Sequence, residues 1–133
     1  MASTSNQKSG GMMWTYSEAC KMLPLLLGAF NLPPGILPLQ NVIELGYVKA
    51  TGYMWILQQN KIEHEFEAIG KVLSYSMEVT GYSDMKCIKK LEGVKAKELL
   101  YAPPILEISV DGTQVIFKSG VGLCRAFPSA AFN

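Results

Sequence analysis

The chain has 133 residues, of which 49% are hydrophobic and 17% are charged, and its formal net charge at neutral pH is +1. This length and composition indicate one globular domain that is large enough to bury a core. The near-zero net charge gives no support to binding of nucleic acid or of an anionic membrane through charge alone.

The first segment, residues 1–13, is polar and rich in glycine and serine, which predicts a disordered tail ahead of a single domain over residues 14–133. No apolar run of signal-peptide length follows a basic start, and the apolar stretch Met22–Phe30 is too short for a transmembrane segment. The three cysteines are widely separated, at Cys20, Cys87 and Cys124. We read them as reduced thiols and expect a cytoplasmic location.

A helix is expected to begin near Thr15, because Thr15 and Glu18 have the spacing of a capping box. Apolar side chains then recur at helical spacing on one face, at Ala19, Met22, Leu23, Leu26, Leu27 and Phe30. Pro24 removes one backbone donor and predicts either a kink or two short turns. Residues 32–39 contain three prolines and are expected to form an ordered connection packed on the body of the fold.

The next segments are typical of strands. Val42–Ala50 and Tyr53–Leu57 flank a tight turn at Thr51-Gly52, and the continuous apolar run of the second strand predicts burial on both faces. From residue 61 apolar and polar side chains alternate, so that one face carries Ile62, His64, Phe66 and Ala68. In the strand that follows, one face carries Leu73, Tyr75, Met77 and Val79.

Further strands are expected in the second half of the chain, at Met85–Leu91 and Leu123–Phe127. The segment Val94–Tyr101 is open between a helix, which its composition favours, and more sheet, which its neighbours favour. Asp111-Gly112 is a hairpin signal, with alternating apolar residues before it and the return strand Val115–Phe117 after it. The series predicts a mainly β fold: a small β-barrel or a strongly bent antiparallel sheet with an N-terminal helix.

His64 is the histidine of this chain and the side chain whose unperturbed pKa lies near neutrality. It shares its face with Ile62 and Phe66, so we expect it to point inward. Two interpretations stay open: a core histidine hydrogen-bonded to the backbone or to a tyrosine, and a general base or ligand-binding group in a barrel interior.

Other candidate ligand contacts are aromatic or basic. If the barrel interior is open, aromatic side chains line it, and we predict ligand contacts at Trp55, Phe66 and Tyr75 together with His64. Arg125 lies between apolar neighbours and predicts either an ion pair with a buried carboxylate or a bidentate contact to the acidic group of a ligand. A basic cluster is read either as a solvated face or as a contact for anionic lipid headgroups; its members are Lys86, Lys89, Lys90, Lys95 and Lys97.

No motif indicates a metal, a nucleotide or a covalent intermediate. One histidine and three scattered cysteines do not supply the closely paired ligands of a zinc site. Neither a P-loop, nor GxGxxG, nor GxSxG occurs in the sequence. We therefore expect no metal and no cofactor, and no nucleic acid as a partner.

Several short motifs occur in a fixed order along the chain. They include Leu32-Pro33-Pro34-Gly35-Ile36-Leu37-Pro38, Glu63-His64-Glu65-Phe66, Val79-Thr80-Gly81-Tyr82 and Arg125-Ala126-Phe127-Pro128. Over roughly residues 19–132 the chain resembles the plant family known as domain of unknown function 538 (DUF538). It departs from the family pattern at Pro24, at Tyr101-Ala102-Pro103-Pro104 and in the short turn at Asp111-Gly112. These departures are read either as drift in loops or as a reshaped pocket.

The resemblance implies a plant source and a β-barrel-like fold with an N-terminal helix. At the family level it suggests similarity to lipid-binding proteins of the bactericidal/permeability-increasing type, and involvement in stress responses or chlorophyll turnover. Our leading hypothesis is a protein that binds a small lipophilic or amphipathic metabolite. The alternatives are a non-catalytic, stress-related interaction protein that uses its outer surface, and a cofactor-free isomerase, cyclase or lyase with His64 as its base.

Overall fold

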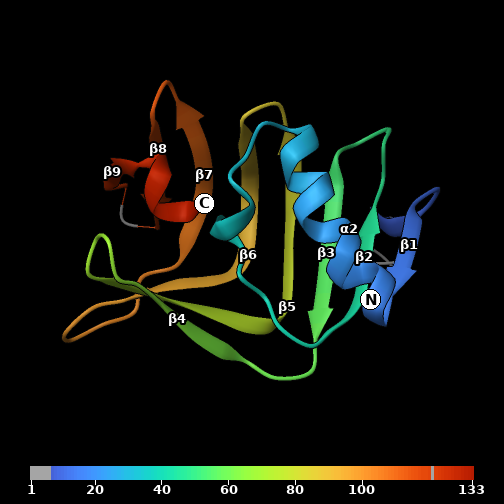
Figure 1. The fold of residues 1–133 in the computed structure, drawn as a ribbon, viewed down its shortest axis with the longest axis horizontal. Coiled ribbons are helices and arrows are strands. Elements are labelled where there is room, and N and C mark those ends of the chain that lie inside the picture. Colours follow the sequence, from blue (N-terminus) through green and yellow to red (C-terminus); the bar gives the residue numbers. More distant parts are fainter. Residues whose placement is uncertain (1–6, 121) are drawn as a thin grey trace.

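The computed structural model of the protein describes residues 7–120 and 122–133. One large antiparallel sheet forms most of this part of the chain, and one α-helix packs against it (Figure 1). The strands are β1 (Met12–Thr15), β2 (Val42–Tyr47), β3 (Tyr53–Gln58), β4 (Ile62–Phe66), β5 (Lys71–Asp84), β6 (Cys87–Lys97), β7 (Ile105–Asp111), β8 (Gln114–Ser119) and β9 (Cys124–Pro128). The helix is α2 (Tyr16–Ala29), and the two 3-10 turns are η1 (Pro34–Ile36) and η2 (Ser129–Phe132).

The strands pair in the order β1-β2-β3-β5-β6-β7-β8-β9, and β4 pairs with β5 outside this path. Within the described residues β1 and β9 stand at the two ends of the path, so the sheet stays open and does not close into a barrel. The expected fold class is confirmed: the fold is mainly β with an N-terminal helix, and of the two expected forms it is the strongly bent antiparallel sheet (Figure 1).

The long strand β5 belongs to two parts of the sheet. Its residues 71–75 pair with β4, and its residues 78–82 pair with β3. β6 follows β5 along both parts, with an irregular register in between. At this irregularity Gly93 of β6 has a φ of +92°, and a Cβ there would overlap the carbonyl oxygen of Glu78. Because only glycine tolerates both conditions, Gly93 allows the two strands to bend together.

Helix α2 begins after Thr15, as the sequence predicts, but the Thr15 side chain makes no capping hydrogen bond. The helix runs through Pro24 as one element, so of the two alternatives expected there, a kink or two short turns, the pair of turns does not form. Pro24 lies on the exposed side, where the carbonyl that loses its intrahelical bond can meet water. The buried side of the helix places Leu23 and Leu27 in the core, which holds the helix against the sheet.

The proline-rich segment packs on the fold, as expected, and fixes the C-terminal turn. Leu32, Ile36 and Leu37 are buried in the main core. Gly35 lies so close to η2 that a Cβ at this position would overlap the carbonyl oxygen of Phe132. The close approach of these two backbones, which only glycine permits, brings Phe132 into the core.

One strand begins earlier than expected, and one segment that the sequence left open is assigned. β1 starts at Met12, where its residues pair with the outer edge of β2, so the last two residues of the segment 1–13 belong to the sheet. Of the other residues of the expected tail, 7–11 are described and include a helical turn at residues 7–8, whereas residues 1–6 lie outside the described part of the chain. The ambiguous segment 94–101 is strand β6 up to Lys97 and then a turn in which the Glu98 amide donates to the carbonyl of Tyr101 at 3.0 Å.

Candidate functional site

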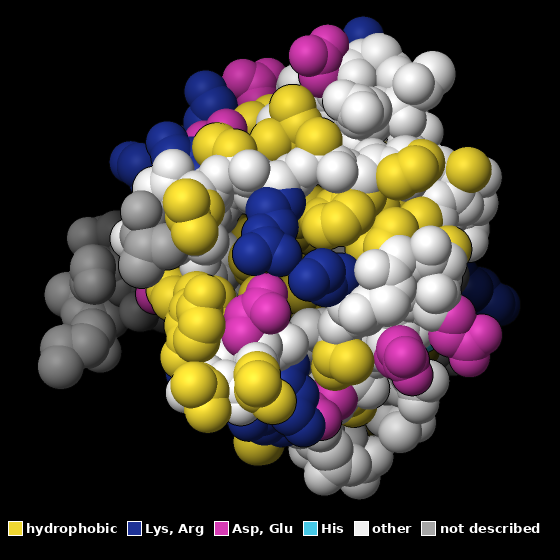
Figure 2. Space-filling view, turned by 90° about the vertical axis from the view of Figure 1, so that its left-hand side faces the viewer, with side chains coloured by type: hydrophobic (Ala, Val, Ile, Leu, Met, Phe, Trp, Pro, Cys, Tyr) yellow, Lys and Arg dark blue, Asp and Glu magenta, His cyan; other side chains and the backbone are white. Residues whose placement is uncertain are grey.

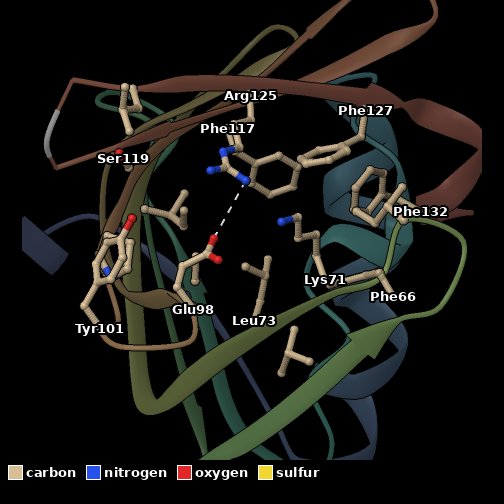
Figure 3. A pocket seen from close by; sticks show the side chains of 16 residues that line it. Phe66, Lys71, Leu73, Glu98, Tyr101, Phe117, Ser119, Arg125, Phe127 and Phe132 are labelled. Carbon is tan, nitrogen blue, oxygen red and sulfur yellow. Dashed lines mark ion pairs between the residues drawn. The ribbon is translucent and has the colours of Figure 1, made fainter.

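A pocket lies at one end of the bent sheet, where the β4–β5 hairpin faces β8, β9 and the C-terminal turn η2 (Figure 3). Its remaining wall comes from the end of β6, the β6–β7 loop and the start of β7. The hollow between the side chains measures about 60 Å³, which is room for a few water-sized groups.

The floor of the pocket is aromatic, and four phenylalanines form it: Phe66, Phe117, Phe127 and Phe132. The ring of Phe132 lies 5.0 Å from that of Phe66 and 5.4 Å from that of Phe117, between centroids. Phe127 meets Phe117 edge-on at 6.0 Å. These separations are in the range in which aromatic rings attract one another. The floor is therefore held by contacts between its own rings.

Two cross-strand pairs bring an aromatic ring and a cation to this end of the sheet. Phe66 closes β4 and stands opposite Lys71, the first residue of β5. Phe117 of β8 stands opposite Arg125 of β9 in the same way. Residues that face each other across an antiparallel pair project to the same side of the sheet. Each of these two cross-strand pairs thus supplies one floor residue and one positive charge.

One acid stands among these cations. Glu98 also lines the pocket, and its Oε1 lies 3.9 Å from Nη1 of Arg125. The Arg125 side chain is 50% exposed and that of Glu98 is 25% exposed, so the pair stands at the mouth and not on the floor. Figure 3 shows both side chains, together with Lys71, directed toward the centre of the pocket. The mouth is therefore charged above an apolar floor.

The wall of the pocket also contains an unpaired polar atom. Ser119 lines the pocket, and its Oγ is buried without a hydrogen-bond partner among the described residues. A buried hydroxyl without a partner is unfavourable by about 1–3 kcal/mol.

Exposed hydrophobic side chains surround the mouth. Leu99 and Leu100 of the β6–β7 loop are 95% and 89% exposed, and Tyr101 and Leu123 are more than half exposed. Figure 2 shows this end of the molecule, with hydrophobic side chains around a small group of basic and acidic ones. We call Leu99, Leu100, Tyr101 and Leu123 the apolar rim.

Of the five residues that the sequence predicts as ligand contacts, two line the pocket, Phe66 and Arg125. The other three lie elsewhere. Tyr75 is buried in the main core, where its hydroxyl donates to the carbonyl oxygen of Ile36 at 3.0 Å. His64 is half-buried and rests edge-on against Phe66 at 4.6 Å, outside the pocket lining. The role of all five in ligand binding stays a prediction.

Trp55 belongs to a separate small cluster with Val48 and Tyr53, on the side of β3 that faces away from the main core. Its Nε1 donates to Oε2 of Glu44 at 2.6 Å, and its ring lies over Gly46, where a Cβ would overlap it. The indole therefore covers a glycine of the neighbouring strand and is remote from the pocket.

Sequence reasoning did not select Lys71, Glu98, Phe127 or Phe132 as site residues. The pairing of β4 with β5 brings Lys71 to Phe66, and the close contact at Gly35 brings Phe132 to the floor. A hairpin signal lies between residues 66 and 71 and could have indicated the first of these. The approach of η2 to η1 has no local signal.

The ionisable groups outside the pocket do not form a second site. Burial is the main cause that raises the pKa of the Cys87 thiol, and the negative charge of Glu107 raises it further. Burial is also the main cause that raises the pKa of the Tyr53 phenol, and the negative charge of Glu78 raises it further. Among the described residues no group of three or more His, Cys, Asp or Glu side chains is placed to hold a metal ion. In the same residues no helix has the length and apolar character needed to cross a membrane.

Comparison with known proteins identifies the family of this chain. The family described as "Protein of unknown function, DUF538" matches residues 23–133. The chain belongs to this family. It is also similar to an uncharacterized protein of Arabidopsis thaliana, with 27% identity over 128 residues, which cover 93% of this chain and 74% of the relative. No solved structure matches the chain.

Proposed function

We propose that the protein binds a small lipophilic or amphipathic metabolite in the pocket at the end of the bent sheet. The aromatic floor carries this proposal, because its rings pack on one another around a hollow that opens under an apolar rim. Concave, mainly apolar sites with a few polar groups are the usual form of small-molecule sites. The sequence suggested a barrel interior as the site. We move it to this pocket, because core side chains fill the inner face of the sheet.

The volume of about 60 Å³ sets the size of the part of the ligand that is buried. A short alkyl chain or the edge of a ring fits on the phenylalanine floor. The rest of the ligand then lies across the mouth, in contact with the apolar rim.

The proposal is tested by filling the pocket from its own wall. Ala96 lines the pocket opposite Leu73 of β5, and Ala96→Leu adds three carbon atoms there. Ala68→Leu makes the same change at an exposed position in the β4–β5 turn, outside the lining. Native mass spectrometry after incubation with a plant metabolite extract then compares both variants with the wild-type protein.

We expect a discrete added mass on the wild-type and Ala68→Leu proteins and its loss in Ala96→Leu. Urea unfolding midpoints for all three proteins check that Ala96→Leu stays folded. An added mass of equal intensity on a folded Ala96→Leu protein would place the ligand elsewhere and refute the proposal. A wild-type protein that takes up no mass would favour the outer surface.

The apolar rim supports a second candidate function, a non-catalytic interaction protein that uses its outer surface. Leu99 and Leu100 are almost fully exposed, and exposed apolar patches are frequent at interaction sites. An acid/base enzyme with His64 as its base has no comparable support, since the imidazole lies outside the pocket lining. A role in stress and a cytoplasmic location stay predictions from the sequence.

A further inference from the structure

The charges at the mouth of the pocket do not balance. Lys71 and Arg125 contribute two positive charges, and Glu98 contributes one negative charge. The ion pairs of the described residues join Lys97 to Glu63 and Arg125 to Glu98, and neither includes Lys71. Figure 3 shows the Lys71 ammonium directed into the pocket. One positive charge of the site is therefore without an acidic partner.

This unpaired ammonium restricts what can bind over the phenylalanine floor. A molecule that enters the pocket removes water from Lys71, and an ammonium that loses its hydration without a partner is strongly disfavoured. A neutral ligand leaves that loss uncompensated, and a cationic ligand adds repulsion. An anionic ligand offsets the loss by a charge-assisted hydrogen bond. Discrimination between ligands of equal apolar size thus depends on their charge.

Arg125 can contribute to the same anion. The 3.9 Å separation of its Nη1 from Glu98 Oε1 is longer than the separation of about 2.7–2.9 Å that is typical of a charge-assisted hydrogen bond. Its planar donors therefore keep capacity for a bidentate carboxylate.

We propose that the ligand is an amphiphile with one carboxylate, held between Lys71 and Arg125 with its apolar part on the phenylalanine floor. The inference rests on the proposed function, because it names the class of ligand for the same pocket. One carboxylate supplies the single negative charge that the mouth lacks. Glu98 competes with the ligand for Arg125, so it weakens binding and does not assist it.

The test uses three probes with the same alkyl chain: octanoate, 1-octanol and octylammonium. Their dissociation constants are measured at neutral pH by NMR titration of the full-length protein. Lys71→Met keeps the apolar stem and removes the charge, and Glu98→Gln removes the competing carboxylate. Lys97→Met is the matched control, because it removes the same charge from an exposed residue outside the pocket lining.

In the wild-type protein we expect octanoate to bind about tenfold more tightly than 1-octanol, with octylammonium the weakest. Lys71→Met should weaken octanoate binding until its affinity equals that of 1-octanol. The affinity for 1-octanol should stay unchanged or rise slightly. Glu98→Gln should strengthen octanoate binding severalfold. Lys97→Met should leave the ratio of the octanoate affinity to the 1-octanol affinity near its wild-type value.

Equal constants for octanoate and 1-octanol in the wild-type protein would overturn the charge inference and leave the proposed function standing. The inference also fails if Lys97→Met lowers the ratio as much as Lys71→Met, since the preference would then reflect overall charge. If none of the three probes shifts a pocket resonance, the proposed function falls together with the inference.

Discussion

Tyr75 links β5 to the proline-rich segment through one buried hydrogen bond, from its hydroxyl to the carbonyl oxygen of Ile36 at 3.0 Å. Burial raises the pKa of this phenol above its ordinary value of 10.0. A raised folded-state pKa means that the folded protein holds its proton more tightly than the unfolded chain. The stabilisation is complete below pH 10.0 and is lost as the pH rises through the folded-state value.

Tyr75→Phe should reduce the free energy of unfolding by about 1 kcal/mol at neutral pH, because the Ile36 carbonyl loses its donor. The variant should also lose less stability than the wild-type protein when the pH is raised above 10.0. Urea unfolding on both sides of that pH measures both effects. Tyr53, whose pKa is also raised, is present in both proteins and does not affect the comparison. If both proteins lost the same unfolding free energy at alkaline pH, the result would contradict the assignment of this loss to Tyr75.

At the same scale, alternation along strands predicted which side chains share a face but not what each face meets. His64 and Phe66 do lie together, with their rings 4.6 Å apart, yet only Phe66 reaches the pocket. Tyr75 points inward as expected, but the interior there is solid core. The difference depends on where the β8–β9 hairpin and η2 pack, and this information is not local to β4 or β5.

At the scale of elements, two glycines predict opposite effects of the same substitution. Gly46 of β2 lies beneath the Trp55 ring, so Gly46→Ala should destabilise the protein by about 1–3 kcal/mol through overpacking. Gly28 lies inside α2 with nothing within 4 Å of the position of a Cβ. Gly28→Ala should therefore stabilise the protein by about 0.5–1 kcal/mol. Thermal denaturation of both variants decides whether the two signs differ.

Most elements were predictable because their signals are local. The turn at Thr51-Gly52 forms where the sequence places it, the second hairpin turns at Gly112-Thr113, one residue after its expected position, and β3 is buried on both faces. Alternation fails in the middle of β5, where Met77 is 58% exposed although it was expected to share a face with buried Tyr75. The bend between the two halves of β5 changes the register there. A pattern of single strands contains no signal for this bend.

At the scale of the whole molecule, β5 should make both parts of the sheet unfold together. Trp14 and Trp55 report on β1 and β3, whereas the exposed Cys124 reports on β9 when it is labelled with a fluorophore. Cys20→Ser removes the second exposed thiol. Cys87 is half-buried and its pKa is raised, so it should react slowly at neutral pH.

We expect the two fluorescence signals to follow one urea transition with the same midpoint, as a two-state domain requires. Two separate midpoints would indicate that the β4–β9 part melts independently of the helix and β1–β3. A Cys124→Ser protein, labelled under the same conditions, controls for signal from Cys87.

A strand shared by both parts also allows distant reporters to sense the pocket. A ligand at one hundred times its dissociation constant adds about 2.7 kcal/mol to the stability of a domain that binds it only when folded, which raises the melting temperature of a domain this size by on the order of 10 °C. Because β5 joins the two parts of the sheet, the fluorescence of Trp14 and Trp55 should report the full rise in melting temperature, although neither residue lines the pocket. Intrinsic fluorescence melting curves are therefore sufficient to screen compound collections without attaching any label near the site.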